Sequence, residues 1–332
     1  MVYYTYSEAG DDNMERMKKQ TKRKLQWLLA LLVLLLAIGI AMLLLRTGVL
    51  YPKGVGEPVR LVENAYVGED LNPDPMTDTA GMTLQSRLLP PDGYVRTAAD
   101  TDSLLKYMRN MALEPDGTEV ADYKGNPVRG SQDAVAVFAM QVGDKDLQQC
   151  ADSVIRVYSE YAWSQGRYDT ICFHLTNGTR MAYSDWLAGD RLLAFGSFAR
   201  MLPLSGDHQG TDYDCFYAYL RTVMRYAGTK SLAAESEQIS LSSLHAGEML
   251  LEGGTPGHVV LVVDEAENEA GERCFLLAQG YMPAQSFHVL SNPAHAGDPW
   301  YYPAELAGDR IETMCYTFSG DCFFRRSEFS GN

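Results

Sequence analysis

The residues best suited to chemistry in this sequence are a cysteine, a histidine and a glutamine that belong to three separate predicted elements. Cys215 lies in the first turn of a predicted helix, in which Phe216, Leu220 and Val223 recur at helical spacing and Thr211 is the expected N-cap. A thiol in the first turn of a helix faces unpaired backbone N–H groups and the positive end of the helix dipole, which favour the thiolate. Cys215 is therefore the candidate nucleophile.

Two predicted strands after this helix carry the other two side chains. The β-branched run His258–Asp264 is typical of a buried central strand, and Cys274–Gln279 forms the next strand. If these strands pair as an antiparallel hairpin, the beginning of the first lies beside the end of the second. His258 would then lie beside Gln279, with the imidazole as general base and the amide as the group that orients the ring.

The order helix-cysteine, strand-histidine, strand-polar residue resembles that of the papain-like amidases and endopeptidases of bacterial cell walls, the NlpC and CHAP types. The matching positions are Cys215, the turn Gly247-Glu248, His258 and Gln279. The resemblance extends from Thr211 to Gln285 and concerns topology, because Asp214-Cys215-Phe216-Tyr217 stands where the first group has Asp-Cys-Ser-Gly. It implies a cysteine hydrolase that cleaves an amide bond.

A closer resemblance covers residues 84–318 and rests on longer motifs. These are LLPPDGYVR (88–96), DLQQCAD (146–152), YAGTKSL (226–232), PGHVVLVVD (256–264) and AQGYMPAQ (278–285). Together they resemble one bacterial family whose domain has no established function. The resemblance implies a protein of the bacterial envelope.

Aromatic and polar side chains near the third strand are the candidate substrate contacts. Tyr281 and Gln285 lie in the loop that follows Gln279, and Trp300 belongs to a later aromatic run that is suited to stacking on sugar rings. Each has a structural alternative, since the loop backbone needs hydrogen-bond partners and Trp300 is equally suited to packing the C-terminal segment.

The cysteines also have structural interpretations. Cys215 would fill space as a small hydrophobic side chain, as free cysteines often do. Cys150 shares a helix face with Val154, and this spacing predicts that it lies in the core. The six cysteines are Cys150, Cys172, Cys215, Cys274, Cys315 and Cys322. Disulfides between them are compatible with an oxidising compartment, and their spacing indicates no particular pairing.

Other catalytic chemistries find little support in the motifs. The sequence has no Gly-x-Ser-x-Gly elbow, no phosphate loop with its lysine and no complete dinucleotide fingerprint, and Gly253–Gly257 is interpreted as a turn. The histidines show no zincin spacing, so we expect no metal and no cofactor; a metal between His288, His295 and a carboxylate is the alternative. A pair of glycosidase carboxylates stays open because acidic residues are abundant.

The remaining elements predict a domain of mixed class. Apolar spacing predicts helices over Thr101–Met111 and Leu147–Tyr161, and alternation predicts a strand over Val135–Met140. Asn177-Gly178 is a strong hairpin signal between two short alternating runs. We therefore expect an α+β fold in which an antiparallel sheet packs on helices, papain-like (NlpC-type) in its C-terminal half.

The first 83 residues differ from the rest in composition. Residues 1–24 form a basic tail, whereas residues 25–45 contain no charge and one polar side chain, Gln26. A helix of that length spans about 31 Å, close to the hydrocarbon thickness of a bilayer. Because no small-residue cleavage site follows, we expect a retained transmembrane helix. Residues 46–83, rich in Pro, Gly and acidic side chains, are expected to form a flexible linker.

Charge predicts the orientation and excludes one class of partner. Five of the seven residues 18–24 are basic, and Lys and Arg beside a span stay cytoplasmic. We therefore expect a cytoplasmic N-terminus and an extracytoplasmic globular domain over residues 84–325. Residues 47–332 carry 21 Lys and Arg against 39 Asp and Glu, and such an acidic domain repels nucleic acid.

Together these features predict a membrane-anchored, extracytoplasmic cysteine hydrolase whose expected substrate is cell-wall peptide. The first alternative is a non-catalytic binding or scaffold domain that holds a wall peptide or an envelope protein. The second is a carbohydrate-active domain with paired carboxylates. The hydrolase hypothesis requires the Cys215 sulfur to share one pocket with the His258 imidazole.

Overall fold

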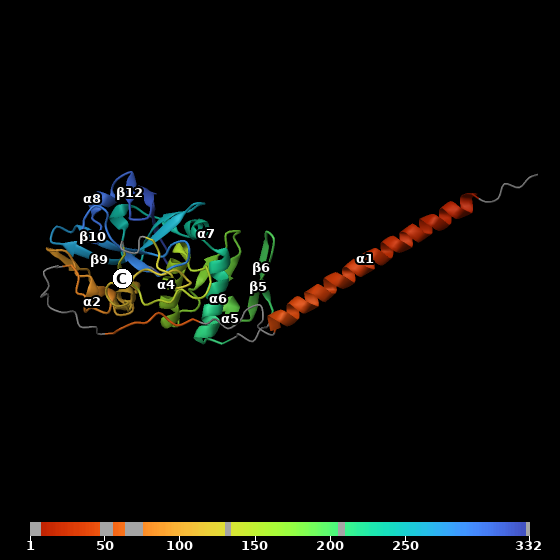
Figure 1. Cartoon of the computed structure of the whole chain (residues 1–332), viewed down its shortest axis with the longest axis horizontal. Coiled ribbons are helices and arrows are strands. Elements are labelled where there is room, and N and C mark those ends of the chain that lie inside the picture. Colours follow the sequence, from red (N-terminus) through yellow and green to blue (C-terminus); the bar gives the residue numbers. More distant parts are fainter. Residues whose placement is uncertain (1–7, 47–55, 64–75, 130–133, 205–209, 330–332) are drawn as a thin grey trace, which may run out of the picture. The chain divides into compact units, whose positions relative to one another are not determined.

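A computed structural model describes five stretches of the chain (Figure 1). These are residues 8–46, 56–63, 76–129, 134–204 and 210–329. The chain divides into two compact units, one that contains the N-terminal helix and one formed by the domain after it.

The N-terminal unit contains one long helix, α1 (Glu8–Arg46). Its segment Arg16–Ile40 is long and apolar enough to cross a membrane, and its apolar side chains, Trp27 and Leu32 among them, are exposed. This confirms the apolar N-terminal helix predicted around residues 25–45. A signal sequence would meet the same criterion of length and composition.

The domain is built on an eight-stranded sheet in which all described pairs are antiparallel. Its strands run in the order β2-β11-β10-β9-β8-β14-β7, and β1 pairs with β9 as well. They are β1 (Tyr94–Arg96), β2 (Ala134–Val137), β7 (Glu237–Gln238), β8 (Met249–Glu252), β9 (His258–Asn268), β10 (Arg273–Gln279), β11 (His288–Leu290) and β14 (Phe323–Arg325). The predicted α+β class with an antiparallel sheet is confirmed.

The longest strand, β9, lies at the centre of this sheet. Its residues from His258 to Ala266 are all buried, which explains the continuous run of apolar side chains in the sequence. β9 pairs with β10 in antiparallel register, with Leu261 opposite Ala278, so the predicted hairpin is confirmed. This register brings the beginning of β9 to the end of β10.

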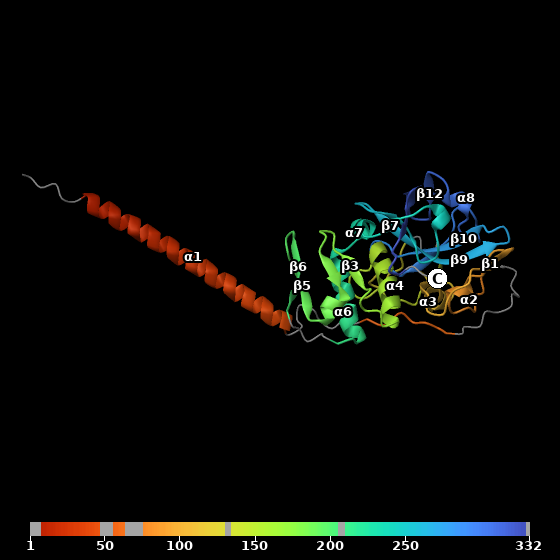
Figure 2. The same cartoon turned by 180° about the vertical axis from the view of Figure 1, so that it is seen from behind.

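Helices cover one face of the sheet. α3 and α4 pack on β9, and α6 packs on α4, so that α4 lies between α6 and the sheet (Figures 1 and 2). The helices of the domain are α2 (Leu84–Arg87), α3 (Leu104–Asn110), α4 (Cys150–Ser164), α5 (Tyr183–Leu187), α6 (Tyr213–Tyr226), α7 (Thr229–Ala234) and α8 (Pro303–Leu306), with a 3-10 turn at Leu241–Ser243. The predicted helices around residues 101–111 and 147–161 are α3 and α4.

The C-terminal segment covers the other face. A short hairpin of β12 (Arg310–Glu312) and β13 (Thr317–Ser319), together with α8, packs on Val260 and Val262 of β9 and their neighbours in β10 (Figure 2). Alternate residues of a strand point to opposite faces. His258 therefore points to the same side as Val260, towards the β12–β13 hairpin.

Two further hairpins stand apart from the main sheet. β3 (Cys172–His174) and β4 (Arg180–Ala182) pair across Asn177-Gly178, as the sequence predicts, and Gly178 has a φ of 85°. β5 (Asp190–Phe195) and β6 (Phe198–Pro203) form the second hairpin, which we did not anticipate.

Part of the predicted linker lies against the domain. Leu61 forms a β-bridge with Met111, and the backbone N–H of Val59 donates to Glu160. Val59 is buried as a result. The described residues 56–62 are therefore a packed strap and not a free spacer, because their apolar side chains and backbone groups find partners on the domain.

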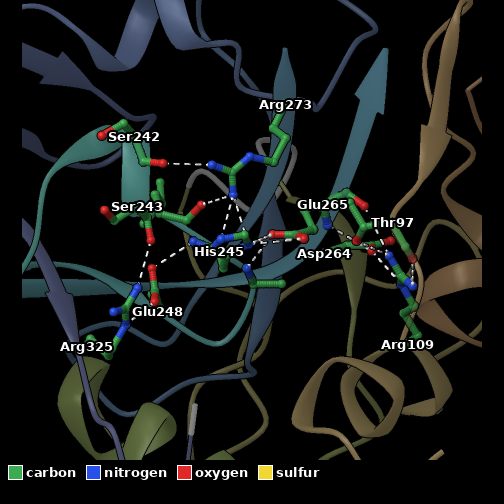
Figure 3. A network of polar contacts seen from close by, with 12 residues as sticks. Thr97, Arg109, Ser242, Ser243, His245, Glu248, Asp264, Glu265, Arg273 and Arg325 are labelled. Carbon is green, nitrogen blue, oxygen red and sulfur yellow. Dashed lines mark hydrogen bonds and ion pairs between the residues drawn. The ribbon is translucent and has the colours of Figure 1, made fainter. Parts of the chain in front are cut away.

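Ion pairs fasten β9 at the end remote from His258 (Figure 3). Asp264 is fully buried and accepts from Arg109 Nε at 2.7 Å and from Arg96 Nε at 2.7 Å. The adjacent Glu265 accepts from the backbone N–H of Ala246 at 2.8 Å, which ties the loop before β8 to the same strand. Each charge is hydrogen-bonded, as a buried charge must be.

The Asp264 pairs predict a large effect on stability. We expect Asp264→Ala to lower the free energy of unfolding by about 3–5 kcal/mol, because two arginines would lose a buried partner. The matched control is Asp185→Ala, whose pair with Arg180 is largely exposed and is expected to contribute at most about 1 kcal/mol. Urea unfolding measures both variants, and equal losses would contradict this interpretation.

Candidate functional site

A pocket of about 430 Å³ opens beside the beginning of β9. Its wall is formed by the first turn of α4, by the junction of α6 and α7, and by the glycine-rich loop before β9, with Met282 at one side. These segments belong to four of the motifs noted in the sequence, which are DLQQCAD, YAGTKSL, PGHVVLVVD and AQGYMPAQ. Motifs that are far apart in the chain therefore meet at one cavity.

The first turn of α4 carries a cysteine to this pocket. α4 begins at Cys150, because the carboxylate of Asp152 accepts the backbone N–H of Gln149 at 3.2 Å and so caps the helix. Val154 and Val157 are fully buried in the core further along. Cys150 is 7% exposed and belongs to the buried core, as predicted from its helix face, and it also lines the pocket.

The Cys150 thiol is a protonated group at rest. Burial raises the pKa of Cys150, and the nearby Asp152 carboxylate raises it further. The backbone N–H groups of Ala151 and Val259 lower the pKa of Cys150 and so act in the opposite direction, favouring the thiolate.

His258 belongs to a chain of three buried polar side chains. His258 Nε2 lies 2.7 Å from Gln279 Oε1, and Gln279 Nε2 lies 3.4 Å from His288 Nε2. His288 Nδ1 lies 2.9 Å from the backbone carbonyl of Ser286. The three side chains come from β9, β10 and β11, and none of them is more than 4% exposed. The predicted proximity of His258 and Gln279 is thus observed.

The backbone of Ser286 determines the protonation pattern of this chain. A carbonyl only accepts, so His288 Nδ1 donates and His288 Nε2 is left as an acceptor. Gln279 therefore turns its amide nitrogen to His288 and its oxygen to His258. The amide oxygen in turn requires a proton on His258 Nε2, and the lone pair of the imidazole resides on Nδ1.

Aromatic rings surround the His258 imidazole. The ring centroids of Tyr281 and Tyr316 lie 5.0 and 5.1 Å from it, and that of Phe318 lies 5.8 Å away. Burial lowers the pKa of His258 to about 4, so the ring is neutral at physiological pH. The described residues form no hydrogen bond to Nδ1, and the His258 side chain is 2% exposed.

Cys150 and His258 approach the end of the sheet from opposite faces. α4 packs on one face, whereas the imidazole lies on the face covered by β12 and β13. Cys150 lines the pocket, whereas His258 is not among the residues that line it. No hydrogen bond joins the thiol to the imidazole among the described residues, and catalytic contacts are often long before substrate binds.

The structure does not bring Cys215 to His258. Cys215 lies in α6, which packs on α4 and not on the beginning of β9, and its side chain is 1% exposed beside Trp186. Burial raises the pKa of the Cys215 thiol. Its helix is capped by Asp212, whose carboxylate accepts the Cys215 N–H at 2.9 Å, and not by Thr211 as predicted. Cys215 is therefore buried and does not line the pocket beside β9.

The three predicted substrate contacts differ in position. Tyr281 is partly exposed next to His258. Gln285 is 4% exposed, and its Oε1 has no hydrogen-bond partner among the described residues. Trp300 is fully buried and donates its Nε1–H to the Leu89 carbonyl at 2.9 Å, so it packs the C-terminal segment and cannot stack on a sugar.

Metal binding finds no candidate in the described part of the chain. No three His, Cys, Asp or Glu side chains converge there as a metal site requires. His288 contacts Gln279 and Ser286, whereas His295 pairs with Glu305 at 2.5 Å. These two histidines therefore do not share a carboxylate.

The chain belongs to the family described as domain of unknown function (4846), DUF4846, whose model matches residues 84–325. This agrees with the resemblance of the motifs to a single family without an established function. The comparisons with curated proteins and with solved structures found no match. They therefore give no support to the papain-like resemblance expected for Thr211–Gln285.

The low pKa of His258 predicts a pH-dependent stability. The ordinary pKa of the unfolded state is 6.5, so the folded protein binds this proton less tightly. The stabilisation by neutral His258 is complete above pH 6.5 and is lost as the pH falls towards 4, by about 3 kcal/mol in total. The advantage of wild type over His258→Gln in urea unfolding should shrink across this window, and a constant difference would contradict the assignment.

The close approach of Gly280 to α4 predicts a steric effect. A Cβ at Gly280 would lie 2.2 Å from Ser153 Oγ and 3.0 Å from the Gln149 carbonyl. We expect Gly280→Ala to lower the free energy of unfolding by about 1–3 kcal/mol, and Ser153→Ala to recover part of this in the double variant. Gly228→Ala is the control, because nothing lies within 4 Å of its Cβ. If calorimetry shows that the losses of the two single variants simply add in the double variant, the predicted clash between the new Cβ and Ser153 is refuted.

Proposed function

We propose that this protein is a membrane-anchored, extracytoplasmic cysteine hydrolase that cleaves an amide bond. Cys150 is the nucleophile, His258 the general base, and Gln279 the residue that orients the imidazole. One observation carries the proposal: Gln279 holds His258 Nε2 at 2.7 Å and so leaves the lone pair on Nδ1, while Cys150 lines the pocket that opens beside the beginning of β9. The proposed order of helix-cysteine, strand-histidine and strand-glutamine is the one that the sequence compares with papain-like hydrolases, with Cys150 in place of the predicted Cys215.

The first half of the reaction forms a thioester. As Cys150 Sγ attacks the amide carbonyl carbon, the thiol proton passes to His258 Nδ1, and negative charge develops on the carbonyl oxygen. Backbone N–H groups of the first turn of α4, which have no partner within the helix, would stabilise this oxyanion. The C–N bond then breaks, and the amine leaves with the proton from Nδ1.

The second half releases the acid and restores the enzyme. Water attacks the thioester carbonyl carbon while His258 Nδ1 accepts its proton, and the C–S bond breaks. The sulfur recovers the proton from Nδ1. Because Cys150 and His258 are both neutral at rest, proton transfer accompanies attack instead of preceding it. A base with a pKa near 4 remains deprotonated in acidic medium, so the acidic limb of activity is expected well below pH 6.5.

Location and substrate follow from the sequence features. The span near residues 25–45 lacks a cleavage site, and the positive charge before it favours a cytoplasmic N-terminus. The domain would then meet cell-wall peptide, the amide polymer of that compartment. Tyr281 beside the imidazole and Gln285, with its unpartnered Oε1, are the proposed contacts to such a peptide.

The hydrolase proposal predicts that one cysteine is essential. In purified full-length protein in detergent, Cys150→Ser should lower the release of new amino groups from cell-wall peptides at least about 10³-fold, because the hydroxyl is a poorer nucleophile. Cys215→Ser is the matched control at a second helix start and should retain activity. Release is measured with an amine-reactive fluorophore.

Two outcomes would overturn the proposal. Equal activity of Cys150→Ser and wild type would remove Cys150 as nucleophile. Binding of wall peptide by the wild type without any release of amine would instead favour the non-catalytic binding domain. Circular dichroism of each variant confirms that the fold is retained.

A further inference from the structure

The glycine-rich loop before β9 packs closely on the first turn of α7. A Cβ at Gly257 would lie 2.4 Å from Thr229 Oγ1, and one at Gly253 would lie 2.7 Å from the Ala233 side chain. The sequence analysis interpreted this loop as a simple turn because it lacks a lysine of its own. A lysine from another element lies nearby, because Lys230 of α7 lines the same pocket as Gly254 and Gly257.

A second cationic side chain lines the same side of the pocket. Arg225, in the last turn of α6, lines the pocket together with Lys230, and both side chains are exposed. Neither forms an ion pair or hydrogen bond with any residue that the structure describes. The two cations are thus available to a ligand, in a domain whose charge is otherwise strongly acidic.

The acidic residues of the pocket are already engaged. Asp146 accepts the backbone N–H of Ala284 at 2.7 Å and the side-chain amide of Gln149 at 3.1 Å. Asp152 is 6% exposed and caps α4. Burial also raises the pKa of Asp152 well above its usual value. The pocket therefore has a cationic wall on the α6–α7 side, whereas its two carboxylates lie on the α4 side, where each accepts a backbone N–H.

We propose that Arg225 and Lys230 bind a free carboxylate of the substrate. The hydrolase would then prefer peptides that carry a carboxylate close to the amide that Cys150 cleaves. This inference rests on the proposed function, because it names the class of substrate that the same site would cleave. Charge-assisted hydrogen bonds between a carboxylate and Arg or Lys are stronger than neutral ones, and salt weakens them where they are partly exposed.

A pair of peptides that differ in one group tests the preference. Both peptides carry the same N-terminal acyl group and sequence, and one ends in a carboxylate and the other in a carboxamide. With full-length wild type in detergent we expect kcat/KM to favour the carboxylate form by about 10- to 100-fold. In Arg225→Gln/Lys230→Gln the two peptides should be cleaved alike, at the rate of the carboxamide.

The control variant is Arg310→Gln, which removes an exposed cation of β12 that does not line this pocket. It should keep the wild-type preference. A double variant that still prefers the carboxylate form would overturn the inference and leave the hydrolase proposal intact. Loss of activity on both peptides in the double variant, with the fold retained, would also overturn it.

Binding to Cys150→Ala separates this inference from the proposed function. Fluorescently labelled carboxylate peptide should bind this variant about tenfold more tightly than the carboxamide peptide, and this difference should disappear when Arg225→Gln and Lys230→Gln are added. This result is expected even if the wild type cleaves neither peptide, which would refute only the hydrolase. Displacement of the peptide by inorganic phosphate and not by acetate at equal ionic strength would assign the wall to a phosphate ligand and overturn the carboxylate.

Discussion

The hydrogen bond between His258 and Gln279 is the interaction on which the site depends. It exists only because β9 and β10 pair in the register that sets Leu261 opposite Ala278, so that the beginning of one strand meets the end of the other. A slip of one residue would turn Gln279 to the opposite face of the sheet and leave the imidazole without a partner. The ion pairs of Asp264 at the far end of β9 help to hold that register.

Because these three polar side chains are buried, each of their hydrogen-bonding groups needs a specific partner. An unsatisfied polar atom in such surroundings costs about 1–3 kcal/mol, so each donor in the His258–Gln279–His288 chain is confined to one partner. The Ser286 carbonyl therefore dictates, through two side chains, which nitrogen of His258 is protonated. A backbone group two strands away thus sets the chemistry available at Nδ1.

The elements could be predicted from local patterns, but the choice of cysteine could not. Alternation and helical spacing located β9, β10 and α4, and antiparallel pairing correctly placed His258 beside Gln279. Cys150 and Cys215 both lie in the first turn of a helix, so dipole arguments apply to each equally. Only tertiary packing distinguishes them, since α4 packs on β9 with Cys150 at the pocket, whereas α6 packs on α4 and Cys215 does not line the pocket. The contact of His288 with Gln279 was missed for the same reason, because it depends on the pairing of β10 with β11.

The tautomer of His258 tests this account most directly. Long-range ¹H–¹⁵N correlation spectra of full-length protein labelled at histidine would identify it, with His258→Gln used for assignment. The account predicts a neutral ring protonated at Nε2, with no titration of that signal between about pH 5.5 and 8. A ring protonated at Nδ1, or one that gains a proton near pH 6.5, would contradict it.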